Sequence, residues 1–149
     1  MRLVAIVGAA LGLALAVSTV LAQTPPTMAV VKDPGCGCCE KWVDHLQRAG
    51  IKATVTESAD IDALKDRRGV PRAARSCHTG TIGGYVIEGH VPVADIKRLL
   101  KERPDVVGLA VPGMPVGSPG METSDGRVDP FDVVAFDKRG QTRVFASHR

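Results

Sequence analysis

The chain has 149 residues, a formal net charge of +3, four cysteines and only 3% aromatic residues. This length fits a single domain with a modest and mainly aliphatic core. The basic residues form no stripe with interleaved aromatic side chains, which argues against a nucleic acid partner.

The N-terminal segment predicts a secretory signal peptide over residues 1–22. Arg2 provides a minimal positive region, residues 3–17 are apolar, and Val20-Leu21-Ala22 is an acceptable cleavage site. The alternative is an uncleaved anchor, in which case the protein would contact the membrane. We expect cleavage, and so an exported domain over residues 23–149 in an oxidising compartment.

Hydrophobic runs bounded by turn residues predict alternating strands and helices. We expect strands at 28–32, 51–56, 73–81, 85–91, 131–136 and 141–145, and helices at 38–49, 61–68 and 95–102. The first seven elements follow the order strand, helix, strand, helix, strand, strand, helix. This order, with cysteines at the start of the first helix, is that of a thioredoxin-like α/β domain.

A long segment over residues 103–126 is rich in glycine and proline and carries Met114 and Met121. It has no periodic hydrophobic pattern, which is typical of either a functional loop or a flexible one. The two strands after it, joined by Asp137-Lys-Arg-Gly140, predict a closing β-hairpin.

The most informative motif is Cys36-Gly37-Cys38-Cys39, which follows a strand and a turn and begins a helix. A helix N-terminus has unpaired N–H groups and a partial positive charge, both of which favour a deprotonated thiol. Thiolate is a nucleophile and also a metal ligand. The motif therefore predicts a reactive or metal-binding site at this helix start.

Copper(I) prefers soft sulfur ligands and tolerates sulfur bridging, so three crowded thiols suit one copper ion or a small cluster. Cys77 could supply a fourth thiolate from a neighbouring segment. The sequence offers further candidate ligands: His78, His90, Met114 and Met121. Each of these four is also explained by ordinary packing or surface exposure.

Three other metal or disulfide readings fit the spacing less well. A structural zinc site usually pairs two separated C-x-x-C units, whereas these thiols are grouped three and one. Adjacent cysteines are too close for usual iron–sulfur ligation. The last reading is an interaction domain stabilised by two structural disulfides. Among the possible pairs, only Cys36–Cys39 or a bridge from one clustered cysteine to Cys77 has unstrained geometry, so two such bonds are hard to form together.

Thiol–disulfide exchange through Cys36 and Cys39 is the alternative function, because a C-x-x-C at a helix start is a redox motif. Such an oxidoreductase could act on protein disulfides or interconvert Cu(II) and Cu(I). The extra Cys38 would interfere with clean exchange, so we consider a metal-binding protein the better interpretation than an enzyme.

Three segments together resemble the periplasmic copper-resistance CopG family, a different family from the plasmid repressor of the same name. They are Lys32-Asp-Pro-Gly-Cys-Gly-Cys-Cys-Glu-Lys-Trp42, Gly69-Val-Pro71 with Ser76-Cys-His-Thr79, and Gly84-Tyr-Val-Ile-Glu-Gly-His-Val-Pro92. The segment from Gly108 to Glu122 extends the match. Many such proteins carry only the label of a domain of unknown function.

The resemblance implies a thioredoxin-like fold that holds copper through Cys36, Cys38, Cys39 and Cys77. It also implies a periplasmic location and a role in copper resistance, with periplasmic copper carriers or exporters as partners. Some members carry an additional C-terminal cysteine pair, which this chain lacks, since it ends Phe145-Ala-Ser-His-Arg149. We therefore expect a periplasmic Cu(I)-binding protein, with zinc a less fitting metal.

Overall fold

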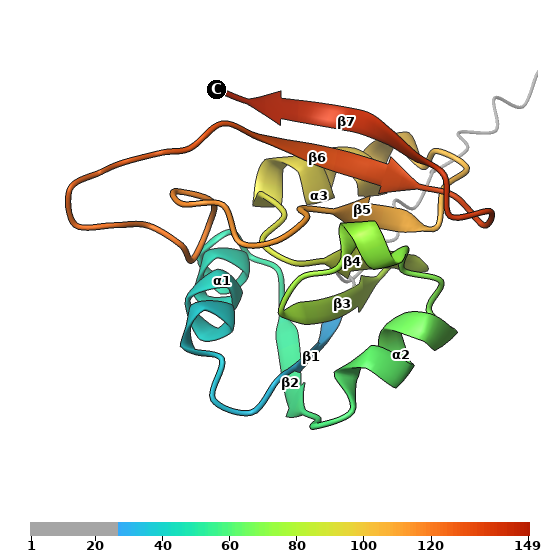
Figure 1. Cartoon of the computed structure of the whole chain (residues 1–149), viewed down its shortest axis with the longest axis horizontal. Coiled ribbons are helices and arrows are strands. Elements are labelled where there is room, and N and C mark those ends of the chain that lie inside the picture. Colours follow the sequence, from blue (N-terminus) through green and yellow to red (C-terminus); the bar gives the residue numbers. More distant parts are fainter. Residues whose placement is uncertain (1–26) are drawn as a thin grey trace, which may run out of the picture.

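The computed structural model describes residues 27–149 (Figure 1). The expected signal peptide and its cleavage site lie outside the described residues. Within 27–149, no helix is both long and apolar enough to cross a membrane.

One mixed sheet of seven strands and three α-helices make up the described domain (Figure 1). The strands are β1 (Met28–Lys32), β2 (Ala53–Glu57), β3 (His78–Ile82), β4 (Tyr85–Glu88), β5 (Gly108–Ala110), β6 (Phe131–Phe136) and β7 (Thr142–His148), and the helices are α1 (Gly37–Arg48), α2 (Ile61–Arg67) and α3 (Val93–Glu102), with a short 3₁₀ helix η1 (Arg72–Ala74).

The strands lie in the order β2-β1-β3-β4-β5-β6-β7. The β1–β2 and β4–β5 pairs are parallel, and all other neighbouring pairs are antiparallel. The predicted order of the first seven elements is confirmed, as is the closing hairpin of β6 and β7.

Side chains that alternate along the central strands divide between two hydrophobic clusters, one on each face of the sheet. Ile87 and Leu109 belong to the larger cluster with residues of α1 and α3, including Trp42, which is fully buried. Val86 and Ala110 belong to the smaller cluster with residues at the end of α2 and in η1. Helices therefore cover both faces, as expected for an α/β domain.

Three local predictions require correction. The expected strand at 85–91 is shorter, because β4 ends at Glu88, so that His90 lies after the strand. The expected strand at 73–81 is shorter, because η1 occupies Arg72–Ala74 and β3 begins only at His78, so that Cys77 lies just before the strand. The segment at 103–126 is not wholly a loop, because it contains β5, which pairs with both β4 and β6.

Candidate metal centre

Three of the four cysteines lie at the N-terminus of α1, as predicted. Cys36 is the N-cap residue, and Cys38 and Cys39 lie in the first turn. The 36–39 pair forms a disulfide, whereas Cys38 and Cys77 are free. The described structure is therefore the oxidised form of the cluster, in which two of the four sulfurs are bonded to each other.

Cys77 comes from the segment before β3 and completes the group. Its Sγ lies 3.5 Å from Cys39 Sγ, and Cys36 Sγ lies 3.3 Å from Cys38 Sγ. All four sulfurs lie within 4.8 Å of one another. Three sulfurs come from one helix turn, and the fourth comes from the segment just before β3. The fold therefore brings together the four cysteines that the sequence predicts as ligands.

Two histidines extend the group on the side of Cys77. Cys77 Sγ lies 3.3 Å from His78 Nδ1 and 3.2 Å from His90 Nε2. Both imidazoles are fully buried, and the His78 ring lies 4.3 Å from that of Trp42. Cys77 is thus shared between a group of four sulfurs and a group of one sulfur and two imidazoles.

Burial keeps both histidines neutral. It lowers the pKa of His78 to about 3, with help from the charges of His90 and Lys65, and it also lowers the pKa of His90. His90 Nδ1 lies 2.8 Å from the carbonyl oxygen of Pro119, so we assign the proton to Nδ1. The lone pair on His90 Nε2 is then directed at Cys77.

His78 contains the one buried side-chain nitrogen or oxygen without a hydrogen-bond partner in residues 27–149, its Nε2. Buried polar atoms are usually paired, and an unpaired one often has a functional role such as binding an ion. The donor set of four sulfurs and two neutral imidazoles suits a soft or borderline metal such as copper or zinc.

The Cys77 thiol is protonated at neutral pH. Burial is the main cause that raises its pKa to about 11, and the neighbouring Cys38 adds to the shift. A metal ion that binds Cys77 would therefore release a proton.

The two loop methionines border the cluster on different sides. Met121 and Cys38 line one open pocket of about 640 Å³, and Met114 lines another of about 450 Å³ with Cys36 and Cys77. The loop itself packs closely on α1, since a Cβ at Gly120 would lie 2.7 Å from the carbonyl oxygen of Cys38. This contact fixes the loop beside the cysteines.

The remaining two histidines have other partners. His45 on α1 pairs with Glu122 at 2.6 Å, and His148 pairs with Asp95 at 2.8 Å and stacks on Phe131. Neither belongs to a described group of metal-ligating residues.

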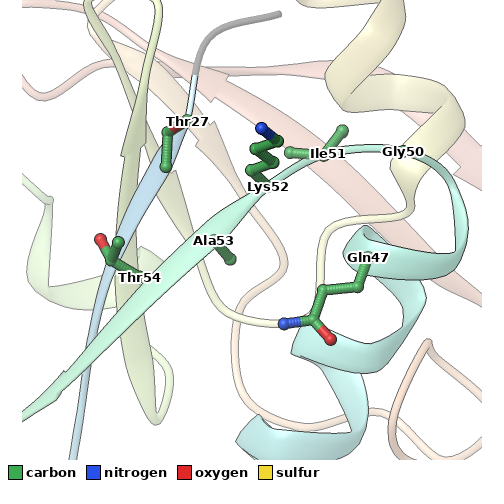
Figure 2. A pocket seen from close by; sticks show the side chains of 7 residues that line it. All are labelled: Thr27, Gln47, Gly50, Ile51, Lys52, Ala53 and Thr54. Atoms are coloured by element: carbon green, nitrogen blue, oxygen red, sulfur yellow. The ribbon is translucent and has the colours of Figure 1, made fainter.

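A further open pocket, of about 630 Å³, lies at the opposite end of α1 (Figure 2). Its lining residues are Thr27, Gln47, Gly50, Ile51, Lys52, Ala53 and Thr54. They include none of the cysteines or histidines, so this pocket is separate from the candidate metal centre.

The contacts that support the site give little signal in the sequence. The Pro119 carbonyl that orients His90 is a backbone group in an irregular loop and gives no sequence signal. Lys65 and Glu88 form a buried ion pair with Nζ and Oε1 2.5 Å apart. Lys65 lies four residues after Ile61 and so on the same face of the helix. A charged residue at this apolar position was the sequence signal for a buried ion pair.

Comparisons with known proteins agree with these observations. Residues 74–121 match a family model described as a protein of unknown function, DUF411. No curated protein matches the chain.

Two solved structures are similar over nearly the whole described domain. Copper resistance protein CopG, Form 2, is 51% identical with a TM-score of 0.80, covering 85% of this chain and 100% of that chain. Form 1 is also 51% identical, with a TM-score of 0.79 and coverage of 84% and 98%. This identity, over almost the full length of both structures, shows that the chain belongs to the CopG family of copper resistance proteins.

Proposed function

We propose that this protein binds Cu(I) through the thiolates of Cys36, Cys38, Cys39 and Cys77 and thereby contributes to copper resistance. The observation that carries the proposal is the convergence of all four sulfurs within 4.8 Å of one another. Such crowding favours bridging sulfurs, because one thiolate can bind two Cu(I) ions, and so a small multinuclear site is included in the proposal.

His90 is a further candidate ligand, because its Nε2 lone pair is directed at Cys77. His78 contributes either its unpaired Nε2 or the contact of its Nδ1 with Cys77. Neutral imidazoles bind copper without first losing a proton.

The proposed setting is the periplasm. The two similar solved structures are named as copper resistance proteins, and the sequence of residues 1–22 has the pattern of a signal peptide. The proposed fold type is thioredoxin-like, supported by the element order and by the cysteines at the start of α1. Copper carriers or exporters of the same compartment are the proposed partners.

Copper binding through all four cysteines requires the Cys36–Cys39 disulfide to be opened. A thiol reductant supplies two electrons and two protons and is itself oxidised to a disulfide, and the two thiols formed lose their protons when metal binds. We therefore propose that the reduced protein is the form that binds copper with high capacity.

The proposal is tested by anaerobic Cu(I) titration of the reduced protein, residues 23–149, with bound copper counted by native mass spectrometry. Each single Cys→Ser variant is titrated beside it. We expect tight binding that is weakened by every one of the four substitutions, including Cys77→Ser.

His90→Asn tests the proposed histidine ligand, and His148→Asn is its matched control. The first removes an imidazole in contact with Cys77, and the second removes one that contacts Asp95 instead. We expect only the first to lower copper affinity. Binding that is weak in the reduced protein, or that is indifferent to Cys77, would contradict the four-thiolate site.

A second candidate function, thiol–disulfide or copper-redox chemistry, is favoured by one specific observation, the Cys36–Cys39 disulfide at the start of α1. In an exchange, a partner thiolate attacks one sulfur of this bond and forms a mixed disulfide. A second partner thiolate then releases the dithiol form and leaves the partner oxidised. This activity needs Cys36 and Cys39 and should survive Cys77→Ser, which separates it from metal binding.

A further inference from the structure

The buried ion pair of Lys65 on α2 and Glu88 on β4 is an unusual feature for so small a core. Lys65 is 1% exposed and Glu88 is fully buried. Removing two charges from water is costly, and apolar residues of similar size are often at least as stabilising as a buried ion pair. Stability alone is therefore a weak reason for this pair, and its hydrogen bonds suggest another.

The Glu88 carboxylate contacts the chain on both sides of Cys77 and His78. Its Oε1 accepts a hydrogen bond from the Ser76 backbone N–H at 2.8 Å, and its Oε2 accepts one from the Thr79 hydroxyl at 2.7 Å. Lys65 Nζ binds Glu88 Oε1 at 2.5 Å and Thr79 Oγ1 at 3.0 Å. We call these four residues, Lys65, Ser76, Thr79 and Glu88, the carboxylate clamp.

Cys77 is the cysteine most in need of such support. Cys36, Cys38 and Cys39 are fixed by the start of α1, whereas Cys77 lies in irregular chain before β3. The Ser76 side chain adds one further restraint, a hydrogen bond of 2.5 Å from Oγ to the carbonyl oxygen of Gly113.

We propose that the carboxylate clamp is a positioning device that holds Cys77 and His78 against the α1 cysteines. The inference rests on the proposed copper site, to which it adds the residues that set the geometry. Ligand positions must be kept to within about 0.5 Å for a site to work well, and loss of such supporting contacts typically costs about 10–100-fold in metal affinity.

Two double variants separate the hydrogen bonds of the clamp from its charge. Lys65→Met with Glu88→Gln is neutral and keeps a side-chain oxygen for the Ser76 N–H. Lys65→Met with Glu88→Leu is also neutral but removes every acceptor. Ile87→Val, a small truncation of a buried neighbour on β4, is the control for a modest loss of stability outside the clamp.

The measurement is Cu(I) affinity of each reduced protein, determined against a competing chelator in both Cys77 and Cys77→Ser backgrounds. We call the double variant with Glu88→Leu the leucine variant and the one with Glu88→Gln the glutamine variant. We expect the leucine variant to bind Cu(I) about 10–100-fold more weakly than the parent when Cys77 is present. In the Cys77→Ser background it should cause no further loss of affinity. We expect the glutamine variant to stay within about threefold of the parent, and Ile87→Val to have no effect.

Equal affinity of the leucine variant and the parent, or losses that add in the Cys77→Ser background, would overturn the proposal. If the leucine variant does not fold, Thr79→Val answers the same question, because it removes one contact of the clamp while keeping a β-branched side chain in β3. It should produce a smaller loss of affinity that again depends on Cys77.

A copper-independent measurement distinguishes failure of the clamp from failure of the copper site. In protein with Cys36, Cys38 and Cys39 all replaced by serine, the clamp should govern the rate at which the Cys77 thiol reacts with iodoacetamide. We expect the leucine variant to change this rate several-fold and the glutamine variant to leave it unchanged. Absence of Cu(I) binding by the parent would refute the proposed function alone, whereas identical alkylation rates would refute the clamp.

Discussion

The two halves of the candidate metal centre are built in different ways. Cys36, Cys38 and Cys39 share one turn of α1, so a single local element positions them. Cys77, His78 and His90 come from two segments on either side of the β3–β4 hairpin, and contacts from α2 and from the loop before β6 hold them. The first half depends on local sequence, and the second depends on the tertiary fold.

The two halves also differ in protonation and oxidation. In the α1 half, a disulfide bond joins Cys36 and Cys39, so two of its three sulfurs are bonded to each other rather than available as thiolates. In the other half, burial keeps Cys77 as a thiol and both histidines neutral. Redox conditions should therefore control the local half, whereas proton competition should control the tertiary half.

The largest expected effect comes from closing the disulfide, which disables the local half alone. Four-ligand structural zinc sites provide about 10–16 kcal/mol, so losing two of four thiolates should cost at least about 4 kcal/mol, or roughly a thousandfold in Cu(I) affinity. The measurement is chelator competition on reduced protein and on protein oxidised before copper is added.

A Cys36→Ser, Cys39→Ser protein is the matched control for that experiment, because it cannot form the bond. Its Cu(I) affinity should equal that of the oxidised parent and should not respond to oxidant. Oxidised parent that binds copper as tightly as reduced parent would show that the high-affinity site does not need Cys36 and Cys39.

The second largest effect concerns the tertiary half. We expect the free energy of unfolding of the metal-free protein to depend on pH through His78. The folded-state pKa of His78 is lowered to about 3, so between about pH 6.5 and 3 the unfolded chain binds more protons than the folded one. The His78 contribution is fully present above about pH 6.5 and is lost as the pH falls. Over the two units from pH 6.5 to 4.5 the loss amounts to roughly 2 kcal/mol.

His78→Phe tests this prediction, since phenylalanine fills the space beside Trp42 but cannot titrate. Urea unfolding at several pH values from 6.5 to 4.5 should give a free energy of unfolding that falls less steeply in the variant than in the parent. All other titratable groups are common to the two proteins, so the difference between their curves reports His78. Parallel curves for the two proteins would mean that His78 does not carry the dependence.

The same division explains what the sequence could predict. The cysteines of α1 were placed correctly because strand, turn and helix start are adjacent in the chain. The convergence of Cys77 with the cluster was suggested as a possibility, but no local pattern fixes its distance from α1.

Other features were beyond local pattern. The strand β5 has only three residues, Gly108–Ala110, too few for an alternating signal, and pairing with β4 and β6 makes it a strand. The helical spacing places Lys65 on the same face as Ile61, but the ion pair that buries Lys65 and Glu88 depends on how α2 packs on the sheet, which periodicity does not reveal. Charged side chains are usually solvated, so each would ordinarily be assigned to the surface.

The smallest expected effect belongs to the two loop methionines, which border different halves of the site. Met121 shares a pocket with Cys38, whereas Met114 is 51% exposed in the pocket next to Cys36 and Cys77. Leucine keeps the size and apolarity of methionine and removes the thioether sulfur, so each Met→Leu substitution tests ligation rather than packing.

We expect Met121→Leu to speed Cu(I) release several-fold, with less than about a tenfold loss in affinity, since thioether is a weaker ligand than thiolate. Met114→Leu should change the release rate less, because the exposed Met114 side chain is solvated and less firmly held beside the cysteines. The core residue Met28, which is fully buried in β1, provides the matched Met28→Leu control. Stopped-flow transfer of copper to a chelator measures the release rates. Equal rates for all three variants and the parent would assign both loop methionines to packing alone and leave the cysteines and histidines as the complete ligand set.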